Sequence, residues 1–323
     1  MSVSKDKFFD KQSQLIERTS IALDISKEEA RKKLQTGRQQ SLRINTLHPE
    51  ASSVQQKLAH MQCVTKPVPW MKDGLFVLEG MHSIRDSSLV EDGLVYIQNA
   101  ASWLPVVALN PKTGDTVLDM CAAPGGKTSH IAQLSQNQAF ISANDNSRPR
   151  LHKMQRNLER LHLSGIVYTL HDATRLSRYL EPESFDKILL DAPCSGEGMM
   201  TLDNKKDFES WSVAHIKRLQ QLQKKLIVQA WQLLKPGGTL VYSTCTMAPE
   251  ENEAVIDYLL RHNDDAVVEP LDSLAAQLDN RVNTVLTWNG KTYDERIKNG
   301  LRLMPSEHVE AFFVIKLTKA FEA

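Results

Sequence analysis

The sequence predicts an α/β protein with a doubly wound, mostly parallel sheet and a smaller α+β module in front of it. Two observations support this fold class. Apolar runs of strand length alternate with helical patterns from about residue 116 onward, which is typical of βαβ units and a parallel sheet. The stretch 116–128 passes from an apolar run through a glycine pair into a helical pattern. Open α/β sheets bind ligands at such a strand–turn–helix junction.

We expect residues 1–85 to form the small module and residues 86–323 the larger domain. In the small module, Asp24 or Ser26 could cap the second of two polar-faced helices, and acidic residues follow in its first turn. The elements expected there are helices at 4–18, 26–36 and 51–62, and strands at 41–47, 64–70 and 75–78.

The larger domain is expected to begin with a helix that follows residues 96–102 and ends near residue 109. The long helix at 212–234 has an apolar face, and we expect the sequence Pro-Gly-Gly at 236–238 to stop it. The other elements expected are strands at 116–120, 139–143, 166–170, 186–190, 239–242 and 311–317, and helices at 127–135, 148–162 and 250–262.

The composition indicates a globular protein with no bulk charge. The net charge is zero, with 41% hydrophobic and 24% charged residues, which argues against binding nucleic acid by overall charge. Two stretches are locally basic, 31–43 and 148–160. Each is either a solvated helix face or part of a track for RNA.

The cysteines favour a reduced compartment. Cys63, Cys121, Cys194 and Cys245 lie far apart and form no C-x-x-C pair, so neither a zinc site nor a disulfide framework is expected. We expect a cytoplasmic protein with no metal. No apolar run approaches the length of a membrane span, so no membrane partner is expected.

Acidic residues follow three successive strands of the larger domain. Asp119, Asp145 and Asp172 each stand at a predicted carboxyl end. An acid in this position commonly accepts hydrogen bonds from ribose hydroxyls, and the third lies within reach of a base edge. No G-x-G-x-x-G and no phosphate-binding P-loop is present, so we predict a nucleoside pocket of another kind.

The next two strands each end in a cysteine-bearing loop. Cys194 lies in DAPCSGEG (191–198) and Cys245 in STCTMAPEENE (243–253). A lone cysteine is usually a small apolar residue, but two in neighbouring polar loops suggest chemistry. Nearby helix N-termini would lower a thiol pKa and favour thiolate. The spacing alone leaves open which cysteine attacks.

These motifs together resemble the NOL1/NOP2/Sun (RsmB/RsmF-like) family of RNA cytosine-5 methyltransferases. The resemblance extends over nearly the whole chain. The segments that carry it are DMCAAPGGKT (119–128), DAPCSGEG (191–198) and KPGGTLVYSTCTMAPEENE (235–253), with LRINTL (42–47), YIQNAAS (96–102) and LRLMPSEHVEAFFVIKL (301–317) as flanks.

The resemblance implies a Rossmann-like class I fold and S-adenosylmethionine as the methyl donor. Asp145 would hold its ribose and Asp172 its adenine. Cys245 matches the family's nucleophile, and Cys194 matches the cysteine that helps release the product. The cofactor-binding residues expected are Cys121, Ala122, Ala123, Pro124, Gly125, Gly126, Lys127, Asp145, Arg150, Asp172 and Asp191; the catalytic residues expected are Cys245, Cys194, Asp191 and Lys127.

Cytosine methylation explains why thiols are useful. Cytosine C5 is a poor nucleophile, and addition of a thiolate at C6 makes C5 enamine-like. Asp191 is the candidate proton donor at N3, and a base must remove the C5 proton before Cys245 leaves. Lys127 either sets the local charge or is an ordinary lysine at a helix start.

The implied substrate is structured RNA, with rRNA as the first choice and tRNA as the alternative. Residues 199–207 lack the basic, proline-containing stretch of many relatives, and we expect no additional C-terminal RNA-binding domain. RNA selection is therefore expected in 1–85 and in the basic faces, on a monomer. Two other functions are possible for this fold: methylation of a protein or small molecule, which needs no thiol nucleophile, and a non-catalytic role in ribosome assembly.

Overall fold

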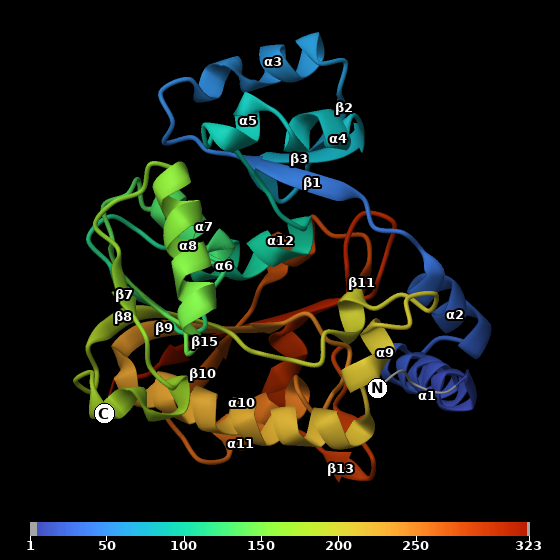
Figure 1. Ribbon diagram of the computed structural model, residues 1–323. Helices are drawn as coiled ribbons and strands as arrows, with labels where there is room; N and C mark the ends of the chain where they lie inside the picture. The colour runs from blue at the N-terminus through green and yellow to red at the C-terminus, as the bar shows by residue number, and fades with distance from the viewer. Residues whose placement is uncertain (1–4, 322–323) are drawn as a thin grey trace.

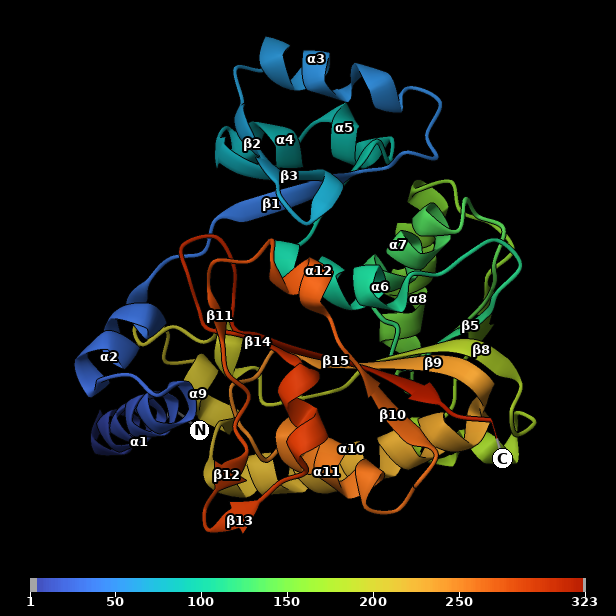
Figure 2. The ribbon, with the colours of Figure 1, turned by 180° about the vertical axis from the view of Figure 1, so that it is seen from behind.

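The computed structural model describes residues 5–321 and has a large sheet covered by helices on both faces (Figure 1). A smaller sheet with its own short helices lies at one end of the molecule, as the views in Figure 1 and Figure 2 both show. The predicted α/β fold with an additional small domain is confirmed.

The large sheet is parallel in one half and antiparallel in the other. Five strands in the order β9-β8-β5-β6-β7 run parallel, and the later strands add antiparallel neighbours beside β9. The strands of this sheet are β5 (Thr116–Asp119), β6 (Phe140–Asn144), β7 (Val167–Thr169), β8 (Phe185–Asp191), β9 (Leu234–Thr244), β10 (Ala266–Glu269), β11 (Arg281–Val282), β14 (Leu301–Leu303) and β15 (Phe312–Lys319).

Successive side chains of the strands pack alternately in two separate hydrophobic cores, one on each face of the sheet. Val117 packs in the core on one face, whereas its neighbour Leu118 packs in the core on the other, because successive strand residues point to opposite faces. One face is covered by α6 (Leu104–Leu109), α7 (Gly126–Leu134), α8 (Arg148–Arg160) and α12 (Asp272–Ala275), the other by α10 (Val213–Leu233) and α11 (Glu253–Leu260). The double burial explains the continuous apolar runs of these strands.

The small sheet has four antiparallel strands in the order β2-β3-β1-β4. Its elements are β1 (Gln40–Ile44), η1 (Ala51–Ser53), α3 (Val54–His60), β2 (Val64–Val68), β3 (Met71–Glu79), α4 (Met81–Arg85), α5 (Ser88–Glu91) and β4 (Val95–Ile97). The boundary expected near residue 85 falls before β4, whose pairing with β1 carries the small sheet to Ile97. We therefore propose 40–97 as the small domain.

Arg43 joins the small sheet to the large domain. Its guanidinium is buried and donates to Ser129 Oγ at 2.6 Å and to Gln133 Oε1, both on α7. Burial lowers the pKa of Arg43 to about 10. The expectation that the basic stretch 31–43 forms one RNA track or solvated face is therefore wrong at Arg43, because its guanidinium is buried and hydrogen-bonded within the protein.

The first two helices do not pack on the small sheet. α1 (Lys5–Leu23) and α2 (Lys27–Gln35) lie beside the loop after β8 (Figure 1). Leu15 and Ile16 share a core with Phe208, in the short helix α9 (Asp207–Ser210), and with Trp211, which directly follows that helix. Lys11 Nζ donates to the carbonyl of Phe208 at 2.6 Å. The predicted start of the first helix at residue 4 lies outside the described residues.

Most predicted elements of the large domain form within a few residues of their expected bounds. The long helix ends at Leu233, and the Pro-Gly-Gly stretch lies inside β9. Residues 266–303, where no element was expected, hold short ones without a readable periodicity. The remaining elements are η2 (Ala100–Trp103), η3 (Ala173–Arg178), η4 (Glu197–Met199), β12 (Thr287–Trp288), β13 (Lys291–Thr292) and η5 (Glu295–Asn299).

Among residues 5–321, no helix combines the length and the apolar character that crossing a membrane requires.

Candidate active site at the carboxyl edge of the sheet

The glycine turn after β5 is shaped for close approach. Gly125 has φ +98°, a conformation that glycine adopts without strain. A Cβ built there would lie 2.9 Å from Met154 Cγ. Asp119 ends β5 and accepts a hydrogen bond from Thr128 Oγ1 at 2.7 Å, which ties the strand to the first turn of α7. Burial raises the pKa of Asp119 to about 7.

The first cavity lies beside this turn and has a volume of about 360 Å³. It contains three of the predicted acids, Asp145, Asp172 and Asp191, and both thiols. Its remaining lining is Met120, Cys121, Ala123, Asn144, Asn146, Arg150, Ala173, Ala192, Pro193, Leu222 and Leu226. Cys245 follows β9 and Asp172 follows β7, the two outer strands of the sheet's parallel half, so the cavity spans its carboxyl edge.

Asp145 is held in a fixed position. Its side chain is 2% exposed and accepts from Ser147 N at 2.9 Å and from Ala123 N at 3.3 Å. Arg150 Nη2 lies 3.4 Å from Asp145 Oδ2 and donates to the carbonyl of Ala123 at 2.6 Å. A carboxylate has about four lone-pair positions, so Asp145 keeps capacity for a ligand hydroxyl.

Asp172 is more exposed and caps the helix that follows it. Its Oδ1 accepts from Thr174 N at 2.9 Å and from Thr174 Oγ1 at 2.8 Å. These hydrogen bonds lower the pKa of Asp172, so it is a charged acceptor at neutral pH. Neighbouring His171 stacks on Tyr179, with ring centroids 4.0 Å apart, and is therefore engaged outside the cavity.

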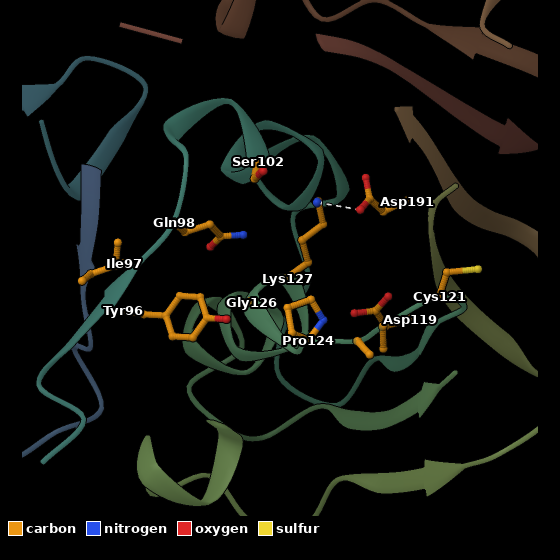
Figure 3. A pocket seen from close by; sticks show the side chains of 12 residues that line it. Tyr96, Ile97, Gln98, Ser102, Asp119, Cys121, Pro124, Gly126, Lys127 and Asp191 are labelled. Atoms are coloured by element: carbon orange, nitrogen blue, oxygen red, sulfur yellow. Dashed lines mark hydrogen bonds and ion pairs between the residues drawn. The ribbon is translucent and has the colours of Figure 1, made fainter. Parts of the chain in front are cut away.

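The second cavity has a volume of about 240 Å³ and is the one shown in Figure 3. Cys121, Ala123 and Asp191 line both cavities. The other residues that line it are Tyr96, Ile97, Gln98, Ser102, Asp119, Ala122, Pro124, Gly126 and Lys127. Tyr96 and Gln98 come from the side of the small sheet, across from the β5 turn in Figure 3. The site is thus bounded by both domains.

Lys127 pairs with Asp191 between the two cavities. Lys127 Nζ lies 2.7 Å from Asp191 Oδ2, the dashed line in Figure 3. Asp191 Oδ1 also accepts from Ser243 Oγ at 2.8 Å. Burial alone would lower the pKa of Lys127, but Asp191 more than offsets it and the net pKa is raised. Lys127 stands in the first turn of α7, and its charge is paired within the site.

The two thiols face each other. Cys194 Sγ and Cys245 Sγ are 3.4 Å apart. The pKa of Cys245 is raised well above the usual value, first by the hydrogen bond with Cys194 and then by burial. The expectation that helix N-termini lower a thiol pKa is therefore wrong for Cys245, because the hydrogen bond with Cys194 and burial both raise its pKa, and the charges of Glu310 and Asp191 add to them. Burial likewise raises the pKa of Cys121.

Gly198 explains how the two cysteine loops come together. Gly198 N donates to the carbonyl of Cys245 at 3.0 Å. A Cβ at this position would lie 2.3 Å from the carbonyl oxygen of Ala311 and 2.9 Å from that of Cys245. Only a residue without a side chain fits, so the last glycine of DAPCSGEG is a packing requirement.

Sequence reasoning missed several side chains of the site. Tyr96, Gln98 and Ser102 line the second cavity, and Glu310 is buried within electrostatic reach of Lys127 and Asp191. Burial raises the pKa of Glu310 to about 7, against the opposing effect of Lys127. The sequence did contain a signal for these residues, because YIQNAAS and the C-terminal segment resemble the family. That resemblance did not indicate a role for any of these side chains.

The second basic stretch, 148–160, has cationic side chains that are exposed to solvent. On α8, Arg148, Lys153 and Arg156 are exposed, and Arg150 reaches the first cavity. Within residues 5–321, no group of three or more His, Cys, Asp or Glu side chains is placed to hold a metal ion.

The comparisons with known proteins agree on one family. The family model described as 16S rRNA methyltransferase RsmB/F matches residues 106–318. The tRNA (cytosine(49)-C(5))-methyltransferase of Pyrococcus abyssi is 37% identical over 282 residues, 86% of this chain and 88% of that protein. The ribosomal RNA small subunit methyltransferase F of Aeromonas salmonicida is 40% identical over 241 residues, 73% and 50% respectively.

A solved structure agrees with the sequence matches. The crystal structure of a methyltransferase homolog protein from Pyrococcus horikoshii is similar with a TM-score of 0.76 and 34% identity, covering 95% of this chain and 99% of that one. The chain spans about half the length of the small-subunit methyltransferases F that it matches. These matches confirm the resemblance drawn from the motifs: the chain belongs to the NOL1/NOP2/Sun (RsmB/RsmF-like) methyltransferase family.

Proposed function

We propose that this protein transfers a methyl group from S-adenosylmethionine to C5 of a cytosine in structured RNA. The observation that carries the proposal is the pair of thiols 3.4 Å apart in the first cavity, at the carboxyl edge of the sheet, beside Asp191, which lines both cavities. Methylation of an amine or oxygen would use neither thiol. A ribosome-assembly factor without catalysis would not need the buried ion pair of Lys127 and Asp191.

The first cavity suits the methyl donor. In this proposal the backbone of 122–127 holds the methionine end, Asp145 accepts from the ribose hydroxyls and Asp172 accepts from the adenine. The fit rests on the lone pairs that Asp145 keeps after its two backbone hydrogen bonds, and on the close approach that Gly125 permits. When bound, the donor supplies an electrophilic methyl group on a sulfonium.

The second cavity suits the target cytosine. It borders the first cavity at Cys121 and Asp191. Tyr96 and Gln98 supply an aromatic ring and an amide from the small-domain side. A base in this position would meet the carboxylate of Asp191 on one side.

The reaction would proceed through a covalent adduct. The thiolate of Cys245 forms a bond to C6, and the Lys127–Asp191 pair provides the proton for N3. C5 would then form a bond to the methyl carbon as the bond from that carbon to the donor's sulfur breaks, leaving the donor as a thioether. A base removes the C5 proton, the bond between Cys245 and C6 breaks, the thiolate leaves, and N3 returns its proton to the Lys127–Asp191 pair. Cys194, beside Cys245, assists this release.

Two classes of RNA are candidates. We propose rRNA first, consistent with the 16S rRNA family model. A specific observation favours tRNA as the second candidate, because the chain covers 88% of a relative named for tRNA. We further propose that α8 and residues 31–33 contact RNA, and that the protein works as a cytoplasmic monomer.

Labelled donor separates these possibilities. Isotope-labelled S-adenosylmethionine with total RNA should give label in 5-methylcytosine after nuclease digestion, and fractionation should place it in small-subunit rRNA or in tRNA. RNA that has already been methylated by the same enzyme is the control and should take up no label. Label found only in protein would refute RNA methylation.

Asp145→Ala tests the donor site. We expect it to weaken S-adenosylmethionine binding by roughly 1–3 kcal/mol, because ribose hydroxyls would be buried without an acceptor. Calorimetry measures the affinity, and Asp73→Ala, outside both cavities, is the control. Wild-type affinity in Asp145→Ala would remove this residue from the donor site.

The proposed roles of the two cysteines predict different effects for their replacement by alanine. Cys245→Ala should abolish methyl transfer while leaving donor binding intact. Cys194→Ala should form the bond and methylate but release RNA slowly, leaving an adduct that survives denaturation and shifts on a gel. RNA with 5-fluorocytosine should trap the wild-type enzyme in the same way, since fluorine does not leave as a proton. An adduct that persists in Cys245→Ala and is lost in Cys194→Ala would reverse the assignment.

The raised pKa of Cys245 predicts a pH shift. Hydrogen bonding to Cys194 is the first cause of that raised pKa, so Cys194→Ala should lower it. Because thiolate is the reactive form, alkylation of Cys245 by iodoacetamide should then reach half its maximal rate at a lower pH than in the wild type. Peptide mass spectrometry identifies the alkylated residue, and Cys63 is the internal control. An unchanged midpoint would contradict a thiol–thiol hydrogen bond.

A further inference from the structure

The two cysteine loops are joined by the residues that follow the thiols. Ser195 comes directly after Cys194, and Thr246 directly after Cys245. Their hydroxyl oxygens are 2.8 Å apart. This contact thus links the loop after β8 to the loop after β9 at the residues that directly follow the two cysteines.

Both hydroxyls also bond to one carboxylate. Ser195 Oγ donates to Glu251 Oε1, and Thr246 Oγ1 donates to the same oxygen at 3.3 Å. The other oxygen, Oε2, accepts from Ser195 N at 3.0 Å. Glu251 therefore holds Ser195 at its backbone and at its side chain together.

The long helix α10 completes the arrangement. Gln223 Nε2 donates to Glu251 Oε2 and to the carbonyl of Pro193, both at 2.9 Å. Pro193 precedes Cys194, so that loop is held on both sides of its thiol. The main-chain carbonyl of Glu251 accepts from Tyr242 OH at 2.5 Å, which ties it to β9.

A second buried acid extends the network away from the cavities. Glu197 Oε2 lies 3.2 Å from Thr246 Oγ1 and shares the single hydroxyl proton of Thr246 with Glu251, and Glu197 Oε1 accepts from Trp211 Nε1 at 3.0 Å. Burial raises the pKa of both acids, that of Glu251 to about 7. Two acids within one buried network are costly to keep unless each is well hydrogen-bonded.

Neither acid faces a ligand. Glu251 and Glu197 are 0% and 2% exposed, and neither lines the first or the second cavity. Ser195 and Thr246 line neither cavity as well. Their hydrogen bonds run between the cysteine loops, so the network acts on the thiols and not on substrate.

We propose that Glu251 is a positioning residue that, with Ser195 and Thr246, sets the separation of the thiols of Cys194 and Cys245. The roles of the thiols rest on the proposed function, but their separation does not. Release of the methylated RNA needs Cys194 close to the sulfur bonded to C6. Loss of the network would separate the loops and slow release more than it slows donor binding.

Oxidation of the thiol pair measures this separation without any RNA. Diamide takes two electrons and two protons from two thiols, forming one disulfide and the reduced hydrazine. Glu251→Ala should slow the formation of the Cys194–Cys245 disulfide about tenfold or more, because the effective concentration of one thiol at the other falls. Ser195→Ala should slow it as well, since the link between the hydroxyls is lost. Mass spectrometry of the linked peptide gives the rate.

Glu250→Gln is the matched control. Glu250 lies in the same loop and pairs with Arg18 at 2.7 Å, but bonds to neither Ser195 nor Thr246. The disulfide should therefore form in Glu250→Gln at the wild-type rate. Iodoacetamide alkylation of both thiols is measured in parallel. A general loosening of the fold would speed alkylation, whereas loss of the network slows disulfide formation without slowing alkylation.

Two outcomes would overturn the proposal. One is wild-type disulfide formation in both Glu251→Ala and Ser195→Ala. The other is an equal slowing in Glu250→Gln. If Glu251→Ala does not fold, as judged by circular dichroism, Ser195→Ala decides alone. Because the assay contains no RNA and no donor, its result stands even if the protein methylates a different substrate.

Discussion

The parallel pairing of β8 with β9 is the constraint on which the site depends. Asp191 at the end of β8 is in register with Ser243 on β9, and the Ser243 hydroxyl donates to Asp191 at 2.8 Å. Both strands run toward the same edge, so the loops that leave them begin side by side. Cys194 follows Asp191 by three residues and Cys245 follows Ser243 by two. Their sulfurs meet because the strands have this register.

Charge balance in the site is the second theme. Lys127 is one buried cation beside Asp191, with Glu310 also within electrostatic reach. The pKa values of Asp119 and Glu310 are each raised to about 7 by burial, and that of Cys245 is raised too. Burial disfavours the charged forms of Asp119 and Glu310, so both carboxyls keep a proton to a higher pH than an exposed carboxyl would. Such perturbed groups around a cavity are typical of sites that move protons.

The parts outside the sheet frame the site from two sides. The small sheet reaches the second cavity through Tyr96 and Gln98 and is anchored to α7 by Arg43. α1 contacts the segment after Cys194, where Gln12 Nε2 donates to the carbonyl of Leu202 at 2.5 Å. The small domain therefore borders the second cavity, whereas α1 packs on the segment that follows the Cys194 loop and lines neither cavity.

The amino-acid sequence was sufficient for the fold class, for the polar strand ends and for the two cysteine loops. The spacing of apolar residues and the position of glycines are local properties of the sequence. They are enough to predict the buried strand that contains Val117 and Leu118, and the strand ends that carry Asp145 and Cys245. The two N-terminal helices were predicted and are present. The place where they pack, the pairing of β4 and the buried role of Arg43 could not be predicted, because each depends on a partner from a distant segment. The raised pKa of Cys245 and the network around Glu251 also became visible only in the packed protein. Burial and the approach of non-adjacent charges set them, and neither is encoded in the spacing of residues along one strand.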